Sequence, residues 1–67
     1  MFDRKLFKYF VERANESPSS VAKHLGVNEA TLYRKMSGAS DFTREEIQNL
    51  KIFLHLTDQE ALQVFFA

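Results

Sequence analysis

The sequence predicts one compact, all-α domain, and three observations lead to this fold class. Its 67 residues leave room for a single hydrophobic core, so we expect residues 1–67 to form one domain. Apolar residues make up 45% of the chain and charged residues 27%, which is typical of a globular protein. Two glycines and one proline are too few for the tight turns of a small β-protein. Short helices joined by polar turns are therefore expected.

Apolar spacing and end signals predict the first two helices. Over about residues 2–14, apolar side chains recur every three or four positions, and Asn15 can adopt the left-handed conformation that ends a helix. The pair Ser17–Pro18 is a start signal, with a hydroxyl cap and a proline at the first helical position. A second helix is expected from there through Leu25, where Gly26 ends it.

Three further helices are predicted from their capping residues. Asn28 is expected to cap a helix over about residues 29–37, which Gly38 closes. The last two starts each match the capping box, in which Ser or Thr is followed three residues later by Glu. They predict helices over about 44–54 and 58–66, with these box residues: Thr43 with Glu46, and Thr57 with Glu60.

The charges cancel overall but are unevenly distributed. Seven basic and four acidic side chains give residues 1–38 a net charge of +3, whereas two basic and five acidic ones give residues 39–67 a net −3. The chain has no cysteine and no apolar run of the roughly 18 residues that a membrane span needs. We therefore expect a cytoplasmic protein with no membrane contact.

The most informative stretch joins the second and third helices. Its connection, residues 26–28, is too short for a hairpin of long antiparallel helices and suits two helices that cross steeply. Ala22, four residues before Gly26, is small enough to allow a close approach of the helices. Leu32 and Met36, four residues apart, are expected to anchor the third helix on the core.

This stretch resembles a known family. Residues 19–38, SSVAKHLGVNEATLYRKMSG, are similar to the helix-turn-helix of phage lambda repressor/Cro-type (XRE-type) transcriptional regulators. The Ala-x₃-Gly spacing, the leucine six residues after the glycine and the final glycine all match, and with residues 41–47 the likeness covers about residues 2–66. The resemblance implies a five-helix lambda repressor-like domain with the helix-turn-helix at helices 2 and 3. It also implies a regulator from a bacterium, phage or prophage that binds an operator in double-stranded DNA.

One face of the third helix is expected to contact bases. With Leu32 facing inward, a step of 100° per residue turns Ala30 and Arg34 outward. In the family this face enters the major groove, where arginine can pair with guanine and an alanine methyl can pack on a thymine methyl. The ordinary alternatives are a helix cap, a favourable anion at a helix start and a solvated cation. The expected base contacts are Asn28, Glu29, Ala30, Thr31 and Arg34.

Phosphate contacts are expected from helix ends and small polar groups around that helix. Each of these residues also fits an ordinary surface position. They are Ser19, Ser20, Lys23, Tyr33, Lys35, Ser37, Ser40 and Arg44.

The C-terminal helix is expected to form a weak homodimer. Leu62, Phe65 and Phe66 form one apolar face, and burying both rings within so small a domain is difficult, although burial of both is the alternative. A two-fold axis through this face would place two recognition helices about 34 Å apart, which fits a pseudo-palindromic operator.

Other functions have less support in the sequence. His24 and His55 have no partner at a nucleophile or metal-ligand spacing, so we expect no enzyme activity, metal, cofactor or small-molecule substrate. The acidic second half favours one rival: a helix-turn-helix-like module of the anti-repressor or antitoxin type that binds another protein instead of DNA.

Overall fold

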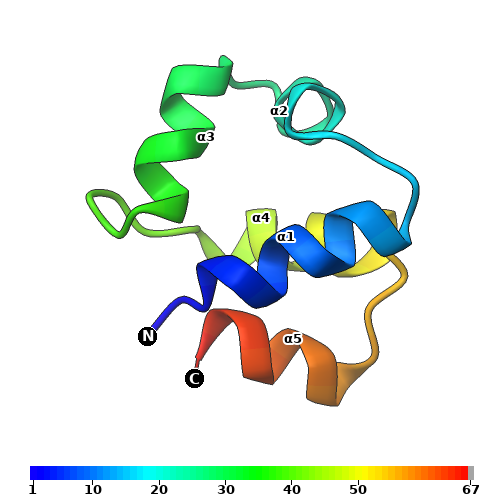
Figure 1. The fold of residues 1–67 in the computed structure, drawn as a ribbon. Helices are drawn as coiled ribbons and strands as arrows, with labels where there is room; N and C mark the ends of the chain where they lie inside the picture. Colours follow the sequence, from blue (N-terminus) through cyan, green and yellow to red (C-terminus); the bar gives the residue numbers. More distant parts are fainter. Residues whose placement is uncertain (67) are drawn as a thin grey trace.

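Five helices follow one another along residues 1–66, the part of the chain that the computed structural model describes (Figure 1). They are α1 (Arg4–Arg13), α2 (Pro18–Leu25), α3 (Glu29–Met36), α4 (Arg44–Phe53) and α5 (Asp58–Phe65). No strand forms within these residues, so the predicted all-α class with five helices is confirmed. The principal extents of 27 × 24 × 21 Å show that the fold is compact. None of these helices has the length and apolar character that a bilayer crossing requires.

The helix starts follow the predicted caps, with one exception. Asn28 accepts a hydrogen bond from the Thr31 amide, and both Thr–Glu capping boxes form. α1 begins at Arg4, two residues later than predicted, because the Asp3 carboxylate accepts from the Leu6 amide at 3.0 Å and caps the helix there. The capping carboxylate of Asp3, which lies within the apolar pattern, therefore determines where α1 begins.

The helix ends also use the predicted conformations. Gly26 and Gly38 have φ of 75° and 89°, and Asn15, as expected, is left-handed at 60°. His55, which follows α4, is left-handed as well, with φ 56°. Each of these residues reverses the chain after a helix, and the glycines do so without the strain that a Cβ would bring.

The core combines apolar side chains from all five helices. Four phenylalanine rings form an aromatic cluster in which every pair of centroids lies within 6.3 Å: Phe2, Phe7, Phe42 and Phe65. The fully buried large side chains are Phe7, Val21, Leu32, Leu50, Leu54 and Val64.

α1 and α5 are joined near both ends. The Asp3 amide donates to the Val64 carbonyl oxygen at 2.8 Å, so the two ends of the described chain lie side by side (Figure 1). Near the other end of α1, the Arg13 guanidinium pairs with both carboxylate oxygens of Glu60, at 2.6 and 3.0 Å. These hydrogen bonds, and after them the one from the Thr57 amide, lower the pKa of Glu60 to about 2.

α2 and α3 pack together across the short turn. Ala22 is buried, and its carbonyl oxygen accepts from the Val27 amide at 3.0 Å. In Figure 1 α2 is seen nearly along its axis while α3 is seen from the side, so the two helices cross steeply as predicted.

Candidate nucleic-acid interface

α3 presents the outward face that its sequence predicts. Leu32 and Met36 are buried, whereas Ala30 and Arg34 are exposed on the opposite side. The Arg34 guanidinium forms no hydrogen bond or ion pair within residues 1–66, so all its donors face solvent. The helix thus carries an unpaired planar cation in the middle of its free surface.

The residues around this face differ in their exposure to solvent and in their hydrogen bonds within the protein. Glu29 and Tyr33 are exposed, and Thr31 is half-buried. The Asn28 side-chain oxygen is occupied at 2.8 Å by the Thr31 amide, which leaves its amide nitrogen for any outside contact. Asn28 therefore serves as the helix cap whether or not it touches a base.

At the start of α2, one of the two expected serines is engaged inside the protein. The Ser20 hydroxyl accepts from the Ser17 amide at 2.9 Å and lies 2.8 Å from Glu16 Oε1, completing a capping box that the sequence analysis did not include. Ser19 and Lys23 are exposed and make no hydrogen bond or ion pair through their side chains within residues 1–66. Of the residues of α2 predicted to bind phosphate, Ser19 and Lys23 are therefore free.

Lys35 lies in a different environment from the phosphate contact predicted for it. Its ammonium donates to the Asp41 carbonyl oxygen at 3.0 Å, lies 3.1 Å from Glu46 Oε1 and stands 5.9 Å from the centroid of the Phe42 ring. Its side chain is only 11% exposed. Glu46, eleven positions later in the chain, draws Lys35 inward, so Lys35 holds the α3–α4 loop against α4.

Glu46 is the other half of this contact. Partial burial raises the pKa of its carboxyl group, but the hydrogen bond from the Thr43 amide and the contact with Lys35 outweigh burial, and the pKa lies below its ordinary value. The carboxylate is therefore charged at neutral pH and keeps its hold on Lys35.

The loop after α3 supplies the remaining expected phosphate contacts. Ser37 and Ser40 are exposed, and Arg44 is exposed at the first position of α4. The Ser37 hydroxyl donates to the Arg34 carbonyl oxygen at 3.0 Å, whereas the Ser40 hydroxyl makes no hydrogen bond within residues 1–66. Ser40 is consequently the free hydroxyl of this loop.

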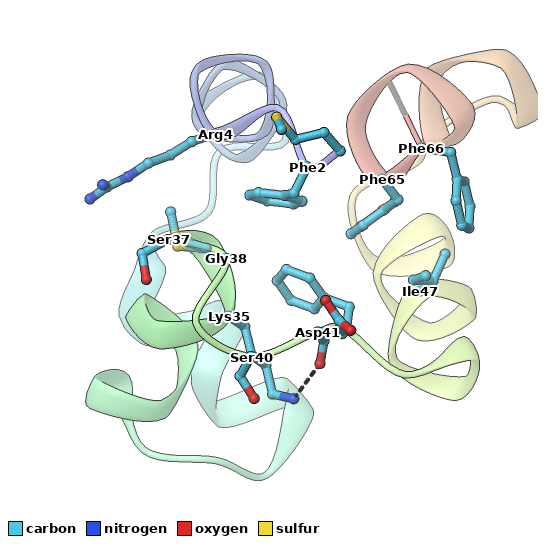
Figure 2. A pocket seen from close by; sticks show the side chains of 13 residues that line it. Phe2, Arg4, Lys35, Ser37, Gly38, Ser40, Asp41, Ile47, Phe65 and Phe66 are labelled. Atoms are coloured by element: carbon cyan, nitrogen blue, oxygen red, sulfur yellow. Dashed lines mark hydrogen bonds between the residues drawn. The ribbon is translucent and has the colours of Figure 1, made fainter.

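A basic residue that the sequence analysis did not select also reaches this loop. Arg4, Ser37, Gly38 and Ser40 line one open hollow of about 740 Å³, whose floor includes aromatic rings (Figure 2). Spacing gave no signal for this placement, because Arg4 and the loop are more than thirty residues apart and meet only in the folded chain.

The expected dimer face is divided between core and surface. Phe65 is 8% exposed and belongs to the aromatic cluster, whereas Leu62 and Phe66 are 58% and 63% exposed. Only Leu62 and Phe66 therefore remain as an apolar surface on α5. One ring, that of Phe65, lies in the core and the other, that of Phe66, does not, so the place of Phe65 in an interface is correspondingly reduced.

The two histidines occupy structural positions. The His24 ring stacks on Phe53 with centroids 4.1 Å apart and planes 11° from parallel, and His55 lies in the turn after α4. No three His, Asp or Glu side chains among residues 1–66 group closely enough to hold a metal ion.

No family model matches this chain, and neither does any curated protein or solved structure.

Proposed function

We propose that this chain is a sequence-specific DNA-binding transcriptional regulator of the lambda repressor/Cro type, whose α3 enters the major groove of a duplex. The observation that carries the proposal is the free face of α3. Ala30 and Arg34 point outward from a helix that Leu32 and Met36 fix on the core. A steep pair of helices with such a face is the arrangement by which helix-turn-helix proteins read DNA. A regulator of this kind acts in the cytoplasm of a bacterial or phage-infected cell.

Base recognition would centre on Arg34. Its unpaired guanidinium can donate two hydrogen bonds to guanine O6 and N7, the commonest specific contact in the major groove. Ala30 lies on the same face, where its methyl group can pack on that of thymine. Glu29 and Thr31 flank these two residues, and the Glu29 carboxylate can accept from a cytosine amino group.

Phosphate binding would use a small number of groups. The exposed candidates without an ion pair or a side-chain hydrogen bond within residues 1–66 are Ser19, Lys23, Tyr33, Ser40 and Arg44. Because only two of them are cations, few counterions would be released on binding. The slope of log affinity against log salt should therefore be much shallower than the value of about −10 known for strongly basic repressors.

Self-association would use the exposed apolar pair on α5. Leu62 and Phe66 lie one helical turn apart and leave two large apolar side chains in water. Two copies meeting here about a two-fold axis would bury them and present two α3 helices to successive major grooves. The operator is then pseudo-palindromic, and the dimer is weak because the apolar face is small.

The proposal is tested by selecting bound duplexes from a randomised library and measuring their affinity by fluorescence anisotropy. Arg34→Ala should weaken binding of the selected site by about 1–3 kcal/mol and abolish preference at one base pair. Arg34→Lys keeps the charge but not the paired donors, so it should lose that preference while retaining most non-specific binding. Arg44→Ala is the matched control, since a lost phosphate contact weakens all duplexes alike.

Two results would contradict the proposal. If the Arg34→Ala protein keeps the wild-type base preference, α3 does not enter the major groove as proposed. A wild-type protein that binds no duplex at low salt would favour the protein-binding module instead, with Leu62 and Phe66 as its contact surface.

A further inference from the structure

The first residue of α1 lies beside the loop that follows α3. Arg4 lines the same hollow as Ser37, Gly38 and Ser40. Figure 2 shows its side chain extending away from the aromatic rings, on the side where Ser37 lies. Asp41, the acidic residue lining this hollow, lies across it beside Phe42. The guanidinium therefore stands at the outer edge of the hollow, with the loop beneath it.

Nothing in the fold uses the charge of Arg4. Its guanidinium makes no hydrogen bond or ion pair within residues 1–66. Arg4 is also the first residue of α1, directly after Asp3, whose carboxylate caps the helix and offsets the positive end of its dipole. No hydrogen bond or ion pair within residues 1–66 uses the guanidinium, so it is available to a ligand outside the protein.

The neighbouring cation cannot substitute for it. Lys35 lines the same hollow, but Glu46 and the Asp41 carbonyl oxygen hold its ammonium. Arg4 is thus an unpaired cation at the rim of this hollow, on the side of Ser37 (Figure 2), whereas Lys35 is held inside the protein.

We propose that Arg4 binds a phosphate of the DNA backbone beside the loop that follows α3. The inference rests on the proposed function and extends the interface beyond α2, α3 and the start of α4 to α1. A guanidinium offers paired N–H donors that match two phosphate oxygens, and such charge-assisted hydrogen bonds are the strong ones. Gly38 has no side chain, and the space where one would stand is empty out to 4 Å, so it does not obstruct the approach of a phosphate.

The experiment measures the salt dependence of binding to the selected duplex for wild type and three variants. Arg4→Ala should lower the magnitude of the log–log slope by about 0.9, the contribution of one phosphate. Its loss of affinity should then be roughly three- to fourfold larger at 50 mM than at 200 mM salt. Arg4→Lys keeps the charge without the paired donors and should retain most of the slope but lose part of the affinity.

Lys5→Ala is the matched control. Lys5 is the next residue of α1, is exposed, makes no ion pair within residues 1–66 and does not line the hollow, yet its loss changes the net charge equally. Lys5→Ala should leave the slope unchanged. Circular dichroism of all variants verifies that α1 still forms, which is expected because both side chains are exposed.

Each outcome decides the matter. If wild type binds duplex and Arg4→Ala keeps the wild-type slope, the Arg4 contact is refuted while the proposed function stands. If Arg4→Ala and Lys5→Ala reduce the slope equally, the effect is one of net charge and the specific contact is refuted. If wild type binds no duplex, the proposed function and the Arg4 contact fail together.

Discussion

Replacing Lys35 with methionine separates two roles for this residue, a clamp on the α3–α4 loop and a phosphate contact. Methionine keeps the apolar stem against Phe42 but removes the ammonium that joins Asp41 to Glu46. The Asp41 carbonyl oxygen can turn to water, and the Glu46 carboxylate keeps its hydrogen bond from the Thr43 amide. What is lost is one ion pair and one hydrogen bond between largely covered groups.

The expected destabilisation follows from that geometry. Exposed ion pairs contribute about 0–1 kcal/mol and hydrogen bonds to charged groups about 1.5–3 kcal/mol. Because the two side chains are 11% and 17% exposed, we expect a loss of about 1–2 kcal/mol. In a domain of this size that corresponds to a fall in Tm of roughly 5–10 °C in a thermal unfolding scan. The salt slope of DNA binding should not change, since the ammonium already has protein partners.

Lys23→Met provides the mirror-image control. Lys23 is exposed on α2 and has no ion pair within residues 1–66, so its loss should leave Tm unchanged and reduce the salt slope by about 0.9. The reasoning about Lys35 is refuted if Lys35→Met keeps the wild-type Tm and lowers the salt slope. In that case Lys35 contacts phosphate, as the sequence alone predicts.

Three further predictions concern stability and assembly. The unfolding free energy in urea should decline as the pH falls from about 4.5 to about 2, because the folded-state pKa of Glu60 is about 2, so its stabilising contribution is complete above about pH 4.5 and is lost progressively down to about pH 2; Glu60→Gln should flatten this decline, and a parallel curve would contradict the pairing with Arg13. Gly26→Ala should lower stability by about 1–2 kcal/mol in thermal scans through left-handed strain alone, since its new Cβ meets no atom within 4 Å; an unchanged Tm would count against this. Phe65→Ala should cost about 3–5 kcal/mol and largely unfold the chain, whereas Phe66→Ala should keep the monomer fold and weaken self-association in sedimentation; equal losses of stability would place both rings in the core.

The helix pattern was predictable because its signals are local. Thr43 and Glu46 are three residues apart, so their capping box can be recognised in the sequence without knowledge of the rest of the fold. The start of α1 was misplaced because an apolar residue at position 2 extended the pattern past Asp3, and the ring of Phe2 packs in the aromatic cluster without being helical. The regular spacing of apolar residues indicates which side chains pack against the core, and a side chain that does so, such as that of Phe2, does not have to lie on a helix.

The candidate interface was predictable only where it lies on one helix. The outward direction of Arg34 follows from its spacing to Leu32, as found. The contact of Lys35 with Glu46, and the hollow that Arg4 lines together with the α3–α4 loop, depend on how the loop lies against α4 and α1, which no short-range spacing encodes. The choice of Phe65 over Phe66 for the core likewise depends on the rotation of α5 about its axis.

The hydrogen bond from the Asp3 amide to the Val64 carbonyl oxygen couples the two ends of the domain. The rings of Phe2 and Phe65, with centroids 5.7 Å apart, add an apolar contact at the same place. If either end of the chain frays, the other end loses its hydrogen-bond and packing partners. The amide hydrogens of the first residues should therefore exchange at rates similar to those of α5. A purification tag fused to the N-terminus would emerge at the hollow that Met1, Ser37 and Phe66 line, where its bulk would interfere with self-association and with the proposed DNA contacts at the end of α3.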